Sequence, residues 1–184
     1  MNLSRPARLG VGLAGGVAVA VALSTSASAH VSIQEDQVAA GSSTIVTLAF
    51  AHGCEGSPTT AIRIQMPESI PTVNPTLNAN WDVEKVTETL DAPIEGAHGE
   101  QITERVSEII YTARTPVEDG FRDTFELSMT FPEDAVGQTI FFPVIQTCEA
   151  GESPWIEIPA EGQDPEELES PAPGVEVVAA AEDA

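Results

Sequence analysis

His30 could chelate a metal ion, because the residues before it have the pattern of a cleavable export signal. Basic residues Arg5 and Arg8 precede an apolar run over Val11–Leu23, and the small residues Ala-Ser-Ala follow. This order is that of a secretory signal peptide, and the run is shorter than the roughly 20 residues that span a bilayer as a helix. We therefore expect residues 1–29 to be removed and His30 to become the N-terminal residue.

A histidine at a free N-terminus supplies two nitrogen donors from one residue. An α-amine has a reference pKa of about 7.7–8.0, so a metal ion displaces its proton at little cost near neutral pH. The amine and the imidazole Nδ1 close a ring around the ion, and the second bond orders little additional chain. Imidazole-rich tetragonal sites favour Cu(II) among the common divalent ions. The sequence therefore predicts that the metal ion bound by His30 is Cu(II).

A third donor must come from elsewhere in the chain, and His52 is the best candidate. It follows an expected strand and precedes Cys54 by two residues, so a disulfide at Cys54 would hold the imidazole still. Glu55 in the same loop is the second candidate, since a carboxylate lowers the charge of a Cu(II) site. The alternative for His52 is a loop histidine bonded to backbone. His98 lies between small residues, and we expect it to be a solvated loop residue.

The chain has two cysteines, Cys54 and Cys148, and an even count in an exported chain predicts a disulfide. The alternative is that the two thiols bind metal. A disulfide would bring Trp155, which follows Cys148 by seven positions, toward the His52 loop. There the indole could shield an open coordination position from solvent. The alternative for Trp155 is an ordinary packing role.

Hydrophobic residues alternate with polar ones along most of the chain, which predicts strands rather than helices. The clearest run is Phe125–Phe131, where one face is apolar and the other is polar. The other expected strands are His30–Ile33, Thr44–Phe50, Ala61–Met66, Trp81–Val86, Glu104–Ala113, Thr139–Gln146 and Trp155–Ile158. Turn residues separate these strands, and we expect residues 91–100 to form an exposed loop. The pattern predicts an all-β fold, an antiparallel β-sandwich of about eight strands with one disulfide.

We expect one folded domain over residues 30–159. Beyond Pro159 the composition shifts to Glu, Asp, Pro and Ala without aromatic or basic residues, which predicts an acidic disordered tail over residues 160–184. Loss of Arg5 and Arg8 from the 7 basic residues would leave five against 29 acidic ones, a formal charge of −24. This charge excludes nucleic acid and anionic membrane surfaces as partners and raises the local concentration of cations. The oligomeric state is left open.

Several blocks of the chain occur together in one exported protein family. They are Ala29–Val31, the stretch from Gly41 through Gly53–Thr60 to Pro67, the pair Asn80–Trp81, the run Phe125–Pro132, Gln146 and Trp155. On these blocks, within roughly His30 to Ile158, the chain resembles the YcnI-like copper-binding family. The resemblance implies an immunoglobulin-like or cupredoxin-like sandwich, Cu(II) bound by the mature N-terminal histidine, and partners among extracytoplasmic copper chaperones or transporters.

This chain differs from that family at the position of one metal-binding residue. Known members of that family carry a glutamate in the second strand, where this chain has Thr44, and a hydroxyl does not replace a carboxylate. His30 and a nearby Trp155 follow from the resemblance, while His52, with Glu55 as fallback, is our own prediction for the third donor. We expect an extracellular, cell-surface or periplasmic copper-binding protein of copper homeostasis or delivery, without enzymatic turnover. The alternatives are a copper-dependent polysaccharide oxidase, which needs a flat aromatic face, and a metal-free structural or adhesive sandwich.

Overall fold

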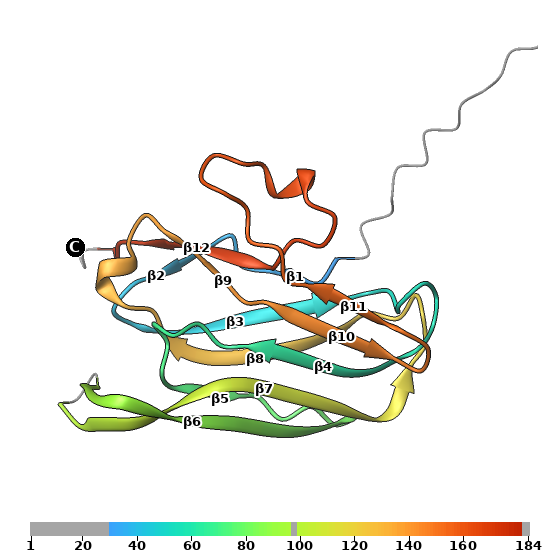
Figure 1. The fold of residues 1–184 in the computed structure, drawn as a ribbon, viewed down its shortest axis with the longest axis horizontal. Coiled ribbons are helices and arrows are strands. Elements are labelled where there is room, and N and C mark those ends of the chain that lie inside the picture. Colours follow the sequence, from blue (N-terminus) through green and yellow to red (C-terminus); the bar gives the residue numbers. More distant parts are fainter. Residues whose placement is uncertain (1–29, 97–98, 182–184) are drawn as a thin grey trace, which may run out of the picture.

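The computed structural model describes residues 30–96 and 99–181. The expected signal peptide, residues 1–29, and His98 lie outside this range, so the structure does not test either expectation. The chain folds into two facing sheets with a smaller third sheet at one side (Figure 1). Among the described residues no helix has both the length and the apolar character needed to cross a membrane.

The first sheet contains four strands in the order β1-β3-β8-β5. Their bounds are β1 (Ser32–Ile33), β3 (Ser43–Phe50), β8 (Asp123–Thr130) and β5 (Val73–Pro75). The second sheet contains five strands in the order β11-β10-β4-β7-β6. Their bounds are β11 (Glu152–Trp155), β10 (Val144–Cys148), β4 (Thr59–Gln65), β7 (Gln101–Val117) and β6 (Trp81–Glu95). All pairs in these two sheets are antiparallel, and the described chain confirms the predicted all-β sandwich.

The alternating sequence of β3 and β8 explains how the sandwich buries its core. The two strands pair so that Val46 faces Leu127 and Leu48 faces Phe125. Three of these side chains have no exposed surface and Phe125 is 2% exposed, whereas polar residues between them point outward. Because side chains alternate across a strand, one apolar face on each strand is enough to form the core. The predicted strand at Phe125–Phe131 is therefore present.

An aromatic cluster joins the two sheets at one end of the core. The ring of Phe125 lies 4.3 Å from Tyr111 and 4.9 Å from Trp81, measured between ring centroids. The polar ends of both partners are paired: the Trp81 indole N–H donates to Asp123 (2.8 Å), and the Tyr111 hydroxyl donates to the Thr76 carbonyl (3.2 Å). Buried aromatic side chains of this kind contribute both apolar area and fixed geometry.

The third sheet corrects the expectation of a disordered tail over residues 160–184. It has the order β2-β12-β9, with β2 (Gln37–Ala39), β12 (Gly174–Val178) and β9 (Thr139–Phe141). Strand β12 runs parallel to β2 and antiparallel to β9, and it buries Val175 and Val177 in the core. The alternation of these valines with polar or small residues makes a strand, which the acidic average of the segment concealed. The domain therefore includes β12.

Two further segments differ from their expected structure. Residues 91–100 were expected to form a loop, but strand β6 of the long β6–β7 hairpin continues to Glu95, with Ile94 opposite Ile102 in β7. Between β11 and β12 the chain forms an exposed acidic loop that contains the 3₁₀-helix η2 (Pro165–Glu167). A second 3₁₀-helix, η1 (Glu133–Ala135), follows β8. The expected strand Thr139–Gln146 is divided into β9 and β10, which belong to different sheets. With the short strands β2, β5 and β12, this division raises the number of described strands to twelve.

Candidate metal centre

The predicted disulfide between Cys54 and Cys148 is present. It joins the loop after β3 to the last residue of β10, across 94 positions of sequence. The Cys54 backbone N–H also donates to Cys148 Sγ (2.9 Å). The loop that carries His52 is therefore tied to the five-stranded sheet directly next to the histidine.

His30 and the His52 loop converge at one end of the sandwich. Strand β1 pairs with β3 so that Ser32 lies opposite Ala49 and Ile33 opposite Leu48. Continued by two residues, the same register places His30 level with Ala51, the residue before His52. Strand β1 is the edge strand of its sheet, so one of its long edges has no partner strand in that sheet.

Trp155 lies directly beside His30. The two rings meet edge to face, with centroids 5.1 Å apart and planes at 90°. His30 precedes the edge strand of the first sheet, and Trp155 ends the edge strand of the second, so this contact bridges the two sheets. Trp155 is 8% exposed, whereas His30 is only partly buried. The buried indole therefore packs against one side of the partly exposed His30 imidazole.

Gln146 connects Trp155 to the His52 loop. The Trp155 indole N–H donates to Gln146 Oε1 (3.2 Å), and Gln146 Nε2 donates to the His52 carbonyl (2.7 Å) and to Thr59 Oγ1 (2.8 Å). Gln146 is 1% exposed. Buried polar groups of this kind are stable only when their hydrogen bonds are made, and here they are.

The His52 imidazole is oriented by Asp119. Its Nδ1 lies 3.5 Å from Asp119 Oδ1, and the Gly53 N–H donates to the same oxygen (2.9 Å). The side chains of His52 and Asp119 are 40% and 43% exposed. Nε2 is then the ring nitrogen that Asp119 does not contact. A carboxylate at one ring nitrogen and a metal at the other is the usual arrangement of a histidine ligand.

Glu55 lies in the tight turn of the same loop. It has a φ of 50°, which is rare outside glycine, and the Ser57 N–H donates to the Cys54 carbonyl (2.9 Å) to close the turn. Its side chain is exposed. Within residues 30–96 and 99–181, no three side chains of His, Cys, Asp or Glu are grouped so that they could hold a metal ion. His30, His52 and Glu55 are therefore not grouped as a three-residue metal site by their side chains alone.

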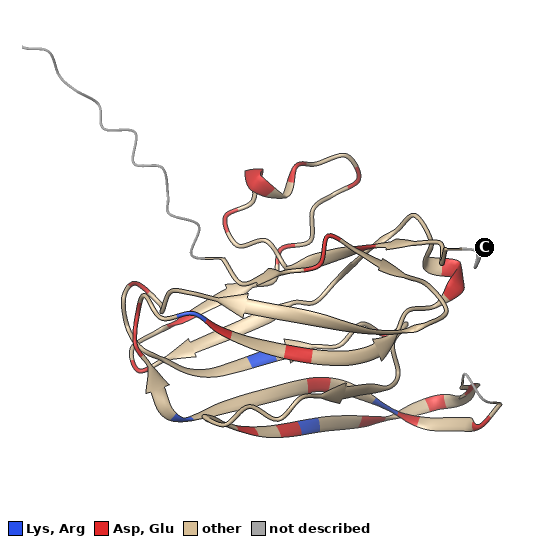
Figure 2. Cartoon of the chain, turned by 180° about the vertical axis from the view of Figure 1, so that it is seen from behind, with Lys and Arg blue, Asp and Glu red and all other residues tan. Residues whose placement is uncertain are grey.

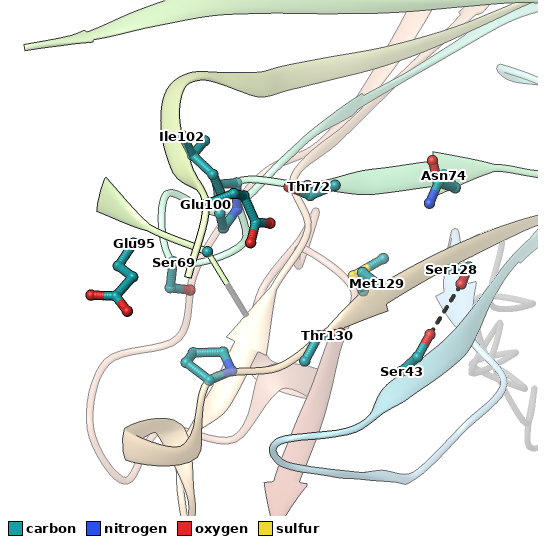
Figure 3. A pocket seen from close by; sticks show the side chains of 13 residues that line it. Ser43, Ser69, Thr72, Asn74, Glu95, Glu100, Ile102, Ser128, Met129 and Thr130 are labelled. Carbon is teal, nitrogen blue, oxygen red and sulfur yellow. Dashed lines mark hydrogen bonds between the residues drawn. The ribbon is translucent and has the colours of Figure 1, made fainter. Parts of the chain in front are cut away.

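Two of the hollows on the described part of the chain differ in position and lining. One, of about 790 Å³, opens beside His30 between β1, β9 and the acidic loop. The other, of about 400 Å³, lies at the opposite end of β3, and its lining mixes hydroxyl groups with carboxylates and apolar side chains (Figure 3). Its Ser43 and Ser128 hydroxyls are 3.5 Å apart. The first hollow has His30 in its lining, and the second does not.

A protein-family model described as "Domain of unknown function (DUF1775)" matches residues 30–177. The chain belongs to the DUF1775 family. The match ends inside β12, in agreement with the burial of that strand, and it begins at His30. A search of functionally curated proteins gave no match for this DUF1775 chain.

Among solved structures, an uncharacterized protein from Nocardia farcinica with an immunoglobulin-like fold resembles this DUF1775 domain. The two are 22% identical, the match covers 81% of this chain and 98% of that one, and the TM-score is 0.60. A putative membrane anchored protein from Corynebacterium diphtheriae is 11% identical over 80% of this chain and 34% of that chain, with a TM-score of 0.41. The first likeness shows an immunoglobulin-like fold. The disulfide between Cys54 and Cys148 indicates an extracytoplasmic protein.

Sequence reasoning missed two residues of this DUF1775 site, Gln146 and Asp119. The sequence could have indicated Gln146, because this polar residue occupies an inward-facing position of β10 between the buried residues Val144 and Cys148. A polar residue at such a position must have buried partners. Asp119 carried no such signal, since it lies in a turn and meets His52 only through the tertiary fold.

Proposed function

We propose that this DUF1775 protein is an exported Cu(II)-binding protein of copper homeostasis or delivery, with the metal held by His30 after signal cleavage. The observation that carries the proposal is the contact of a reachable His30 imidazole with the buried Trp155 indole, 5.1 Å away. The family match that begins at His30 supports the same N-terminus.

The donor set fits Cu(II) when the α-amine of His30 is included. The amine and the imidazole Nδ1 of His30 would supply two nitrogens, and His52 Nε2 would supply the third. The 3.5 Å contact between His52 Nδ1 and Asp119 supports this choice, because it leaves Nε2 for a metal. Glu55 is the fallback donor from the same loop. Three nitrogen donors with an open position match the preference of Cu(II).

The remainder of the domain contributes rigidity and charge. The disulfide and the Gln146 hydrogen bonds fix the His52 loop, so little chain must be ordered when copper binds. Acidic side chains outnumber basic ones over the described surface, which raises the local concentration of cations (Figure 2). We propose binding and transfer without turnover, and extracytoplasmic copper chaperones or transporters as partners.

The test compares the mature chain that starts at His30 with a version that carries one extra glycine before it. Both are titrated with Cu(II) against a competing chelator and examined by electron paramagnetic resonance. With the extra glycine, the free α-amine belongs to the glycine and no longer to the residue that carries the imidazole Nδ1. We expect a changed copper hyperfine pattern and an affinity lower by about tenfold or more, equivalent to about 1.4 kcal/mol or more.

A chain that starts with His30→Ala is the matched control for loss of the imidazole, and it should lose the site. Equal affinity and identical spectra for all three chains would show that copper is not held at the N-terminus. Oxidised sugars released from chitin or cellulose in the presence of a reductant would instead favour a polysaccharide oxidase.

A further inference from the structure

We propose that Gln146 is the positioning residue of this metal centre, which fixes the Trp155 indole against His30 and the His52 loop beside it through one buried amide. This inference rests on the proposed function and adds to it a residue that contacts no metal. Its basis is a continuous path of contacts from the His30 ring through Trp155 and Gln146 to the His52 backbone.

The Gln146 side-chain amide makes hydrogen bonds to residues of three different segments of the chain. Oε1 accepts from Trp155 at the end of β11, and Nε2 donates to His52 in the loop after β3 and to Thr59 at the start of β4. Thr59 has no exposed surface, and its hydroxyl lies 4.0 Å from Cys148 Sγ. The amide therefore lies between the disulfide on one side and the Trp155 indole on the other.

The partners of this amide define which residue type can occupy the position. An indole N–H requires an acceptor, and a backbone carbonyl requires a donor, so the amide has a single favourable orientation. If the amide were flipped, it would place a donor against the indole N–H and an acceptor against the His52 carbonyl. An ionised glutamate could accept from Trp155 but could not donate to His52. A methionine of similar length offers only a weak sulfur acceptor to Trp155 and no donor to His52.

The backbone of β10 strengthens the same connection. The Gln146 carbonyl oxygen lies 3.5 Å from Cys54 Sγ, and the Cys54 N–H donates to Cys148 Sγ (2.9 Å). The loop is thus held covalently at Cys54 and by a hydrogen bond at the His52 carbonyl. Gly53, between His52 and Cys54, is held by the bond from its N–H to Asp119 (2.9 Å). The Gln146 bond holds the His52 carbonyl on the other side of that peptide, so the two bonds together limit where the His52 imidazole lies.

The test uses Gln146→Met, Trp155→Phe and the double variant in the mature chain. Trp155→Phe keeps an aromatic ring beside His30, but it removes the indole N–H together with part of the buried ring system. The chain contains two tryptophans, so the nuclear magnetic resonance spectrum has two indole N–H signals. Trp81 donates to Asp123 away from this site and serves as an internal reference.

In the metal-free protein, Gln146→Met should accelerate hydrogen exchange of the Trp155 indole by about tenfold or more, while the Trp81 indole keeps its rate. In the copper-loaded protein, Gln146→Met should shift the copper hyperfine pattern and weaken Cu(II) binding by about 10- to 100-fold. The double variant should be no weaker than the more affected single variant, because both substitutions break one path. Gln65→Met, at an exposed position of β4, is the matched control and should change none of these measurements.

The outcomes separate the two proposals. If the wild-type chain binds copper at His30, and Gln146→Met changes neither the indole exchange nor the copper spectrum, the role of Gln146 is overturned alone. If the wild-type chain does not bind copper at His30, the proposed function fails and the metal role of Gln146 fails with it. If Gln146→Met does not fold, an unchanged copper spectrum and affinity in Trp155→Phe would overturn the inference.

Discussion

Single residues in this protein acquire their roles from partners that are distant in sequence. His52 is the clearest case, because its ring is contacted by Asp119 and its carbonyl by Gln146, from two other parts of the chain. A histidine that has one ring nitrogen against a carboxylate and its backbone held in place loses little freedom when it binds a metal. The same ring in a mobile loop would be a weak ligand.

At the residue scale, we predict that His52→Ala weakens Cu(II) binding by about 10-fold or more, an estimate based on the loss of a properly oriented ligand. His98→Ala removes another histidine and is the matched control, with little expected effect. Isothermal titration of the mature chain with Cu(II) measures both. If Glu55→Gln weakens binding and His52→Ala does not, the third donor is Glu55.

Individual elements bring the two edges of the sandwich together. Strands β1 and β11 end their respective sheets on the same side, which allows His30 to meet Trp155. Strand β12 covers the adjacent side of the core, and its partner β2 comes soon after β1 in the chain. Because β12 holds β2 in a parallel pair, the C-terminal segment stabilises the part of the chain that positions His30.

At the element scale, we predict that Val177→Ala lowers the free energy of unfolding by about 2 kcal/mol. Val177 has no exposed surface, so the substitution removes two buried carbons and leaves a small cavity. Val136→Ala is the matched control, because Val136 is 46% exposed, and its effect should stay within about 0.5 kcal/mol. Urea denaturation followed by tryptophan fluorescence measures both. Equal effects would mean that β12 does not contribute to the cooperative core.

The molecule as a whole combines a buried aromatic core with a strongly acidic surface. Three of the five basic residues among the described ones are in ion pairs with carboxylates: Arg63 with Glu108, Arg105 with Glu88, and Arg114 with Asp82. Most acidic side chains therefore have no basic partner to neutralise them. The core is affected by this charge too, since burial first and Glu126 second raise the pKa of Tyr111 above its usual value near 10.

At the scale of the whole molecule, we predict that stability falls as the pH rises above about 10. The folded protein keeps Tyr111 neutral, whereas the unfolded chain ionises it near its usual pKa, so high pH favours unfolding. Below that pH the group has no such effect. The chain has one tyrosine, and its absorbance change near 295 nm should therefore accompany unfolding. Tyr111→Phe should show a smaller loss of stability between pH 9 and pH 11; an equal loss would contradict the prediction.

The sequence by itself determined the fold class and the disulfide. Alternating side chains along β3 and β8 are a local property, because the side-chain period of a strand depends only on its backbone. An even cysteine count in a chain with an export pattern was enough to pair Cys54 with Cys148. The expectation that His30 can chelate a metal ion also follows from its position directly after a signal-cleavage pattern.

Only the tertiary structure decided which side chains meet. Strand β12 escaped prediction because its two buried valines lie in a segment whose average composition is acidic. The inner parts of β6 and β7 were predicted, but the outer part of their hairpin was not, because its polar strands extend beyond the core. Asp119 and Gln146 reach the His52 loop through contacts that join residues 66 and 94 positions apart. Such contacts depend on strand order and register across the sheets, which local alternation does not specify.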